Sequence, residues 1–224
     1  MNIKAFQSKI EYSFKNEMLL ETALTHSTYA NENHTESYER LEYLGDAIVD
    51  FLVGEYLFIN YPDLDEGYMS RIRAALVCEK TLGELALKLG IDKYLRLGHG
   101  AEQAGDRRRI SILADVFEAH IAAMYLDRGF EETKKYLINV YGDLIDKTVE
   151  EGKFLDYKTK LQEKLQENGC CEIEYRIKSA DGPVHHCLFV VEVVFDGKVL
   201  GEGTGYSKKE AQQSAARNAL KKIK

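Results

Sequence analysis

Three carboxylates lie close together in the segment Glu39-Arg-Leu-Glu-Tyr-Leu-Gly-Asp46. In a helix with 3.6 residues per turn, Glu39, Glu42 and Asp46 fall within an arc of roughly 60°, opposite the apolar positions of the segment. Such an arc is either a solvated acidic face or a group of anionic oxygens presented to a ligand.

A second pair of carboxylates, Asp115 and Glu118, lies in the segment 114–126, which is otherwise apolar on every side except at His120. Asp and Glu are almost never fully buried unless they are paired or bound to a metal ion. The i,i+3 spacing directs both side chains to one side of a helix. The pair therefore predicts a ligand site. The alternative is a buried pair satisfied by helix caps or by arginines from elsewhere in the chain.

If the two helices face each other, four carboxylates meet: Glu42, Asp46, Asp115 and Glu118. Two such charges ~4 Å apart repel by about 1 to 4 kcal/mol, so the cluster needs cations. Ligands that are all oxygen favour hard ions, and Mg²⁺ is the usual one where phosphate completes the coordination shell. Two such ions activate a water and stabilise the leaving oxygen of a phosphodiester.

Helical periodicity dominates the first 150 residues, where apolar residues recur at steps of three and four. Leu41, Leu44, Ile48, Phe51 and Leu52 form one such stripe, which predicts a buried helix face. The expected helices cover residues 15–25, 36–59, 67–89, 110–127 and 130–149, followed by a short polar join at 150–156. Residues 1–150 therefore predict an all-helical domain.

Residues 156–224 have the pattern of a small α+β domain. A first helix and three strands are expected at 156–168, 172–179, 186–195 and 198–205. The Asp196-Gly197 pair predicts a hairpin turn, and Ser207 with Glu210 predicts a capping box that starts a last helix. The order helix, three strands, helix predicts a sheet with helices on one face.

Two lysines, Lys208 and Lys209, fall in the first turn of this last helix. Cations there oppose the helix dipole at a cost of about 0.3 kcal/mol or more each. A helix start that has free N–H groups and nearby cations is, however, well suited to phosphate. The two lysines are therefore either merely solvated or a phosphate-binding pair.

The chain of 224 residues has a net charge of −7, but its charges are unevenly distributed. Residues 1–154 contain 18 basic and 27 acidic residues (−9), whereas residues 155–224 contain 12 and 10 (+2). Because salt screens surface charges beyond about 10 Å, the total charge does not exclude a nucleic-acid partner.

No apolar run approaches the roughly 20 residues of a membrane span, so we expect no membrane partner. Residues 1–17 lack the pattern of a signal peptide, which predicts a cytoplasmic location. The four cysteines show no paired metal-ligand spacing, which argues against a zinc site or a disulfide framework. We expect no organic cofactor.

The motifs of the first 150 residues resemble those of bacterial ribonuclease III. Residues 39–49 are similar to its signature segment and residues 111–119 to its second acidic motif, and Thr25-His26-Ser27 and Asp65-Glu66-Gly67 match in order. The resemblance implies an all-helical homodimer with two active sites, one for each strand of a double-stranded RNA. It also implies hydrolysis that leaves 5′-phosphate and 3′-hydroxyl ends with a short 3′ overhang.

The same resemblance implies roles for individual residues. The implied ligands of Mg²⁺, which Mn²⁺ can replace, are Glu42, Asp46, Asp115 and Glu118. Asp46 and Glu118 would be essential for catalysis, and Glu39 and Glu66 would help to place the RNA strand. The implied substrates are ribosomal RNA precursors and other structured transcripts, including messenger and transfer RNA.

Residues 155–224 resemble a double-stranded-RNA-binding domain along their full length, in residues 156–163, 182–185 and 201–209. The resemblance implies that the first helix meets one minor groove, the 182–185 loop meets the next, and the lysines bridge the phosphates between them. This mode reads the A-form shape with little sequence preference. The implied RNA contacts are Thr159, Gln162, Glu163, Gly182, Pro183, His185, Ser207, Lys208 and Lys209.

The chain departs from the family pattern at four positions. Tyr43 stands where Phe is usual at the dimer contact, and Ala122 stands where Gly is usual. His120 occupies a usually apolar position, and Ile173 replaces a usual Pro. None of them is one of the four acids, so they put local packing in doubt rather than the reaction.

Two other functions fit part of the sequence. A non-catalytic binder of duplex RNA would need the acidic cluster to be vestigial. A metal phosphohydrolase for small nucleotides would leave residues 155–224 without a role.

His26, His34 and His99 are expected to be structural or exposed. Arg107-Arg108-Arg109 is expected to be a solvated loop, with a phosphate contact as the alternative.

Overall fold

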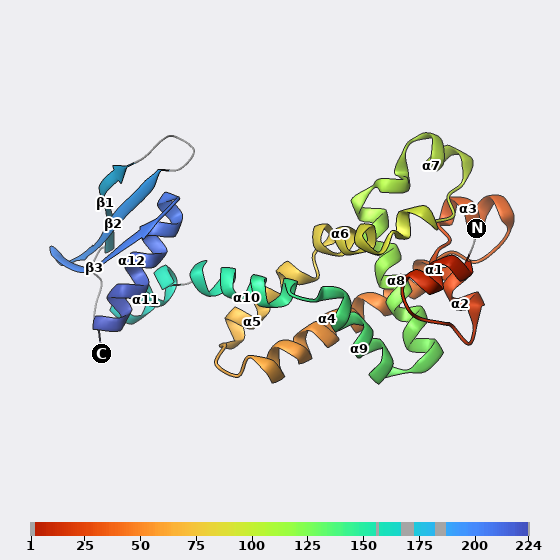
Figure 1. The fold of residues 1–224 in the computed structure, drawn as a ribbon, viewed down its shortest axis with the longest axis horizontal. Coiled ribbons are helices and arrows are strands. Elements are labelled where there is room, and N and C mark those ends of the chain that lie inside the picture. Colours follow the sequence, from red (N-terminus) through yellow and green to blue (C-terminus); the bar gives the residue numbers. More distant parts are fainter. Residues whose placement is uncertain (1–2, 156, 167–172, 182–186, 224) are drawn as a thin grey trace. The chain divides into compact units, whose positions relative to one another are not determined.

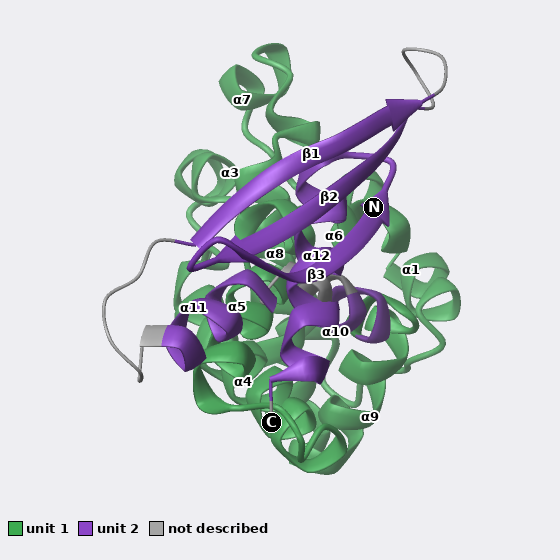
Figure 2. Ribbon diagram, turned by 90° about the vertical axis from the view of Figure 1, so that its left-hand side faces the viewer, with its two compact units in different colours: residues 1–145 green, residues 146–224 purple. Residues whose placement is uncertain are grey.

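The computed structural model describes residues 3–155, 157–166, 173–181 and 187–223 (Figure 1). The chain divides into two compact units, unit 1 (residues 1–145) and unit 2 (residues 146–224) (Figure 2). Unit 1 is helical and unit 2 combines helices with a sheet, which confirms the predicted fold class. Among the described helices, none is both long and apolar enough to cross a membrane.

Unit 1 consists of helices that follow one another along the chain. They are α1 (Ile3–Lys9), α2 (Glu17–Ala23), α3 (Ser27–Asn33), α4 (Glu39–Asn60), α5 (Glu66–Leu76), α6 (Glu79–Leu89), α7 (His99–Gln103), α8 (Ile110–Arg128) and α9 (Phe130–Tyr141), with 3-10 turns η1 (Ile91–Lys93) and η2 (Asp106–Arg108). The sequence pattern did not predict α1, α3 and α7. Each spans seven residues or fewer, which is at most about two helical turns and gives a weak periodic signal.

Helix α8 forms the centre of unit 1, because eleven of its nineteen residues are buried. The helices α2, α4, α6 and α9 pack around it. Val116, Phe117 and Ile121 are completely shielded from solvent, and each such side chain contributes roughly 1.5–3 kcal/mol through the hydrophobic effect. The predicted burial of this helix is confirmed.

Two helices that we expected to be continuous are each divided in two. The expected helix 67–89 is interrupted at Val77 and Cys78, between α5 and α6. The expected helix 130–149 is interrupted at Gly142, whose φ is +52°. α10 (Leu144–Leu155) then continues through most of the predicted polar join. The apolar period persists across both interruptions, so periodicity alone could not reveal them.

The predicted apolar stripe of α4 is buried only in part. Leu41 and Leu52 are 8% and 0% exposed, whereas Phe51 is 57% exposed and contacts the ring of Phe130 at a centroid distance of 5.8 Å. Tyr43 and Phe58 on the same helix are also exposed. Helix α4 therefore carries apolar side chains that the described part of unit 1 does not cover.

Unit 2 has the predicted order of elements. After α11 (Tyr157–Gln166), the strands β1 (Ile173–Asp181), β2 (Leu188–Phe195) and β3 (Lys198–Gly205) form an antiparallel sheet in sequential order, and α12 (Lys208–Lys222) follows. Asp196 and Gly197 both have positive φ, as a two-residue hairpin turn between right-handed twisted strands requires. The predicted hairpin is confirmed.

Helix α12 lies against the sheet (Figure 2), at very short range because glycines of β3 face its alanines. A Cβ atom at Gly203 would overlap the backbone nitrogen of Ala215, and one at Gly201 would lie 2.6 Å from the Ala215 oxygen. The remaining core consists of Leu161, Leu165, Val191, Val193, Ala211, Ala216 and Ala219. This small core depends on the absence of side chains at Gly201 and Gly203 of β3.

Replacement of Gly203 by alanine should therefore force α12 away from β3. We expect a loss of about 1–3 kcal/mol in the stability of unit 2, the usual cost of overpacking. Hydrogen exchange of the β3 and α12 amides in the full chain measures this loss. Thr204→Ala, at an exposed position of the same strand, is the matched control. Equal exchange rates in the two variants would contradict the close-packing argument.

His120 is fully buried on α8 among aromatic rings. Its Nε2 lies 3.2 Å from the Tyr136 hydroxyl, and the rings of Phe6 and Phe14 lie at centroid distances of 5.7 and 6.2 Å. Its Nδ1 has no hydrogen-bond partner among the described residues. Burial lowers the pKa of His120 to about 3, so the folded protein contains a neutral imidazole at physiological pH.

This burial predicts a loss of stability in acid. In the unfolded chain, the histidine binds a proton below its ordinary pKa of 6.5, whereas folded His120 stays neutral there. Stability should therefore fall by up to about 1.4 kcal/mol for each pH unit below 6.5. His120→Leu should remove this dependence. Urea unfolding at pH 7.5 and pH 5.5 measures the difference, and an equal pH dependence in wild type and variant would refute it.

Candidate active site

The helices α4 and α8 touch through their backbones at Gly45. A Cβ atom at Gly45 would overlap the carbonyl group of Glu118, so only glycine permits this approach. On α4, Glu42 lies one turn before Gly45 and Asp46 follows it directly, while Asp115 lies one turn before Glu118 on α8. Four carboxylates from segments far apart in the sequence are thereby brought to one crossing point.

The carboxylates at the crossing point are close enough for their charges to interact. Burial raises the pKa of Glu118 to about 8, and the negative charges of Asp46, Asp115 and Glu42 contribute to this rise. Burial also raises the pKa of Glu42, with Asp115, Glu39 and Asp46 adding to the effect. Every charged residue that shifts these two pKa values is itself acidic. The cluster therefore lacks internal neutralisation by lysine or arginine at these two sites.

Asp115 is held by a neighbouring phenol. The Tyr38 hydroxyl donates a hydrogen bond to Asp115 Oδ2 at 3.3 Å, and Tyr38 itself is 4% exposed. Burial raises the pKa of Asp115, while the hydrogen bond from Tyr38 and the nearby His26 act in the opposite direction. Burial and the adjacent carboxylates keep the pKa of Tyr38 above its usual range, so this hydroxyl is a donor.

The residues present suit a hard cation. Within the described part of the chain, no three His, Cys, Asp or Glu side chains are arranged to hold a metal ion as they stand. The donors at the crossing are nevertheless all carboxylate oxygens, the ligands that Mg²⁺ and Mn²⁺ favour. The raised pKa values of Glu42, Asp115 and Glu118 indicate an uncompensated negative charge that a divalent ion would relieve. Glu42, Asp46, Asp115 and Glu118 could therefore hold such an ion once their side chains turn toward it.

Glu39 and Glu66, the two acids expected to help place the RNA strand, have different surroundings. Glu39 is exposed at the first position of α4, where it accepts a hydrogen bond from Ser37 and raises the pKa of Glu42. Glu66 is exposed at the first position of α5 and accepts a hydrogen bond from Ser70. Glu39 thus borders the acidic cluster, whereas the described contacts of Glu66 remain within α5.

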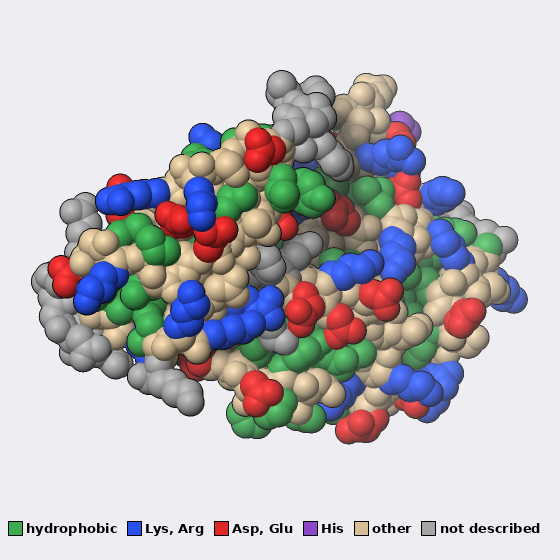
Figure 3. Space-filling view, turned by 60° about the vertical axis from the view of Figure 1, so that its left-hand side comes forward, with side chains coloured by type: hydrophobic (Ala, Val, Ile, Leu, Met, Phe, Trp, Pro, Cys, Tyr) green, Lys and Arg blue, Asp and Glu red, His purple; other side chains and the backbone are tan. Residues whose placement is uncertain are grey.

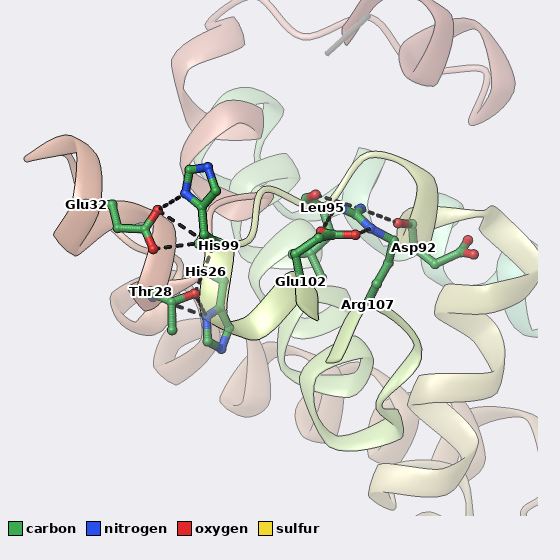
Figure 4. A network of polar contacts seen from close by, with 9 residues as sticks. His26, Thr28, Glu32, Asp92, Leu95, His99, Glu102 and Arg107 are labelled. Atoms are coloured by element: carbon green, nitrogen blue, oxygen red, sulfur yellow. Dashed lines mark hydrogen bonds and ion pairs between the residues drawn. The ribbon is translucent and has the colours of Figure 1, made fainter. Parts of the chain in front are cut away.

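His26 has a structural position at the start of α3 (Figure 4). Its Nδ1 accepts a hydrogen bond from the backbone N–H of Thr28 and caps the start of α3. Its ring meets the Tyr38 ring edge-on at a centroid distance of 5.6 Å. The other histidine in this network, His99, is highly exposed and bonds to Glu32. Both histidines agree with the expectation from sequence.

The three consecutive arginines do not form one solvated loop. The Arg107 guanidinium donates hydrogen bonds to the Glu102 carboxylate and, at 2.8 Å each, to the carbonyl oxygens of Asp92 and Leu95 (Figure 4). The expectation is therefore wrong for Arg107, which fastens η2 to the preceding loop. The other two side chains, those of Arg108 and Arg109, are 77% and 65% exposed.

Two residues of the site, Tyr38 and Gly45, were not predicted from the sequence. A glycine inside a helical pattern costs about 1 kcal/mol relative to alanine, so its presence in the middle of α4 was a signal of close packing. Tyr38 gave no such signal, because a single tyrosine near the start of the expected helix 36–59 has no distinctive spacing.

In unit 2, the predicted RNA contacts of the two helices are exposed. These are Thr159, Gln162, Glu163, Ser207, Lys208 and Lys209. The start of α11 is joined to the second turn of α12, because the backbone N–H of Lys158 donates to the side chain of buried Gln213 at 3.0 Å. Three further predicted contacts, Gly182, Pro183 and His185, lie outside the described residues.

The start of α12 is ordered as a capping motif. Ser207 Oγ accepts a hydrogen bond from the backbone N–H of Glu210, and the Glu210 carboxylate accepts one from the backbone N–H of Tyr206. The predicted reciprocal cap is thus confirmed, with Tyr206 as the backbone donor in place of Ser207. It leaves the exposed side chains of Lys208 and Lys209 in the first turn, next to the positive end of the helix dipole.

Comparisons with known proteins agree with both parts of this description. A family model described as ribonuclease-III-like matches residues 16–143, and the double-stranded RNA binding motif matches residues 157–223. The ribonuclease 3 of Clostridium tetani is 44% identical over 224 residues, which cover all of this chain and 95% of that protein. The ribonuclease 3 of Listeria monocytogenes is 46% identical over 223 residues, covering 97% of this chain and 96% of the relative.

Solved structures show the same similarity. The nuclease domain of ribonuclease III from Campylobacter jejuni aligns with a TM-score of 0.59 at 38% identity, covering 62% of this chain and 95% of that domain. Dicer from Pichia stipitis aligns with a TM-score of 0.50 at 28% identity, covering 92% and 94% of the two chains. The chain belongs to the ribonuclease III family and is an endoribonuclease with a nuclease domain followed by a double-stranded-RNA-binding domain.

Proposed function

We propose that this endonuclease cuts double-stranded RNA with the help of Mg²⁺ held by Glu42, Asp46, Asp115 and Glu118. The observation that supports the proposal most directly is the backbone contact of Gly45 with Glu118, which gathers these acids on two helices. The products would carry 5′-phosphate and 3′-hydroxyl ends with short 3′ overhangs. Structured transcripts, including ribosomal RNA precursors, would be the substrates.

The four acids would act by holding a cation and orienting the scissile phosphate toward it. A bound divalent ion would supply an activated water and neutralise charge that develops on the phosphodiester. Glu118, with its pKa raised to about 8, would release its proton when the cation binds. Asp46 and Glu118 would be the essential residues, and Glu39 and Glu66 would contact the RNA strand near the cleavage site.

Affinity for the duplex would come mainly from unit 2. The exposed residues at the start of α11, with Lys208 and Lys209 of α12, offer polar groups for a minor groove and cations for phosphate. Figure 3 shows basic and acidic side chains interspersed on the face in view, so local groups rather than a uniform field would attract the RNA. Gly182, Pro183 and His185 would add contacts from their loop.

We propose that the functional unit is a homodimer, with one active site for each RNA strand. The exposed apolar side chains of α4 support this, because Tyr43, Phe51 and Phe58 are 83%, 57% and 70% exposed. Exposed apolar groups that gather on one element mark an association surface.

A cytoplasmic location is supported by the free thiols of Cys78 and Cys187.

Glu118→Gln should abolish cutting while leaving RNA binding intact, because the substitution removes an anionic ligand and none of the exposed cations. Loss of an indirect partner of a metal ligand costs 10–100-fold, so loss of a direct ligand should lower the cleavage rate by more than about 100-fold. A labelled RNA duplex incubated with Mg²⁺, and separately with EDTA, measures cutting and binding in parallel.

Glu131→Gln is the matched control for this experiment, because Glu131 is an exposed glutamate of the same unit on α9. The control should cut at the wild-type rate. Substantial cutting by Glu118→Gln would remove Glu118 from the mechanism. Binding without cutting by the wild-type chain in Mg²⁺ would instead favour a non-catalytic RNA-binding protein.

The double variant Lys208→Ala/Lys209→Ala should bind all duplex sequences more weakly. Each phosphate contact that is lost should reduce the slope of log affinity against log salt by about 1. Binding is measured in EDTA over a range of salt concentrations. Lys221→Ala/Lys222→Ala changes the same charge at the other, equally exposed end of α12 and should have little effect. Equal slopes for the two double variants would refute the assignment.

A further inference from the structure

Tyr38 connects three parts of unit 1 at the edge of the acidic cluster. Its hydroxyl donates to Asp115 Oδ2 on α8 at 3.3 Å. Its carbonyl oxygen accepts the hydrogen bond from the backbone N–H of Glu42 at 2.8 Å, which closes the first turn of α4. Because the residue is 4% exposed, its ring is fixed by packing. Tyr38 therefore contacts both helices that carry the acids.

The position of Tyr38 is in turn fixed by the Thr25-His26 segment. The backbone N–H of Tyr38 donates to the Thr25 oxygen at 2.9 Å, and the ring lies edge-on to His26. That segment forms a parallel bridge with Arg96. The backbone N–H of Arg96 donates to the Leu24 oxygen at 2.8 Å, and the backbone N–H of His26 donates to the Arg96 oxygen at 3.0 Å. A continuous set of backbone bonds thus leads from this bridge to the tyrosine.

We propose that Tyr38 is a positioning residue, whose hydroxyl fixes the Asp115 carboxylate beside Glu42 so that the acidic cluster binds its divalent ion more tightly. The inference rests on the proposed function, because it concerns the ion that the four acids would hold. It also gives a role to the Thr25-His26 segment, which holds the tyrosine through a backbone hydrogen bond and a ring contact. Tyr38 accordingly acts through Asp115 and not on the RNA.

The physical reason is the cost of ordering a carboxylate. A free aspartate samples several rotamers, and binding an ion requires it to lose that freedom. A donor that already holds one oxygen reduces this cost and fixes the orientation of the ligand. Such a donor changes the affinity for the ion and leaves the chemical groups of the reaction unchanged.

The test uses Tyr38→Phe, which removes only the hydroxyl and keeps the buried ring. Binding of Mn²⁺ to the full chain, measured without RNA by electron paramagnetic resonance of the free ion, should weaken by about tenfold, the lower end of the effect for such partners. In cleavage assays the Mg²⁺ concentration for half-maximal rate should rise by the same factor. The rate at saturating Mg²⁺ should be restored, because the variant retains all four acids.

Tyr56→Phe removes a hydroxyl from the far part of α4 and is the matched control, with wild-type Mn²⁺ affinity expected. An unchanged Mn²⁺ affinity of Tyr38→Phe, alongside normal binding by wild type, overturns the role of Tyr38 and leaves the proposed function standing. A slower rate that saturating Mg²⁺ does not restore overturns it too. Failure of the wild-type chain to bind Mn²⁺ overturns both.

Discussion

The contact between the backbones of α4 and α8 is the constraint on which the nuclease domain depends. At Gly45 the two helices are so close that any side chain would overlap the carbonyl of Glu118. A glycine in the middle of a helix sacrifices about 1 kcal/mol of intrinsic helix stability. That loss is offset by the packing of α8, in which eleven of nineteen residues are buried. The same contact fixes the distance between two pairs of acids that lie about 70 residues apart in the chain.

Without a cation, the acidic cluster is electrostatically unfavourable. Burial and mutual repulsion raise the pKa values of Glu42, Asp115 and Glu118. The apolar surroundings of α8 prevent the helix from moving away to relieve this repulsion. On the opposite side of the same helix, burial keeps His120 neutral. Because Glu118 and His120 are only two residues apart, one buried helix supports an anionic cluster on one side and an uncharged polar core on the other.

The sequence predicted the fold class, the two acidic segments, the hairpin at Asp196-Gly197 and the helix start at Ser207, because each rests on local spacing. It did not predict the interruption at Gly142 or the role of Tyr38. The apolar period continues across Gly142, whose unusual backbone is a property of the folded loop. Tyr38 reaches Asp115 over a separation of 77 residues, and no local pattern encodes such a contact. What the sequence alone could not supply is tertiary geometry.

The two parts of the chain differ in net charge. Residues 1–154 carry a net charge of −9, and the acids at the crossing of α4 and α8 concentrate negative charge at one place. Residues 155–224 carry +2 and present lysines at a helix start. A cation bound among the acids would remove both the repulsion between carboxylates and the repulsion of phosphate. Under the proposed function, RNA would be held through unit 2 in the absence of a metal ion, whereas a close approach of the scissile phosphate to the acids would need one.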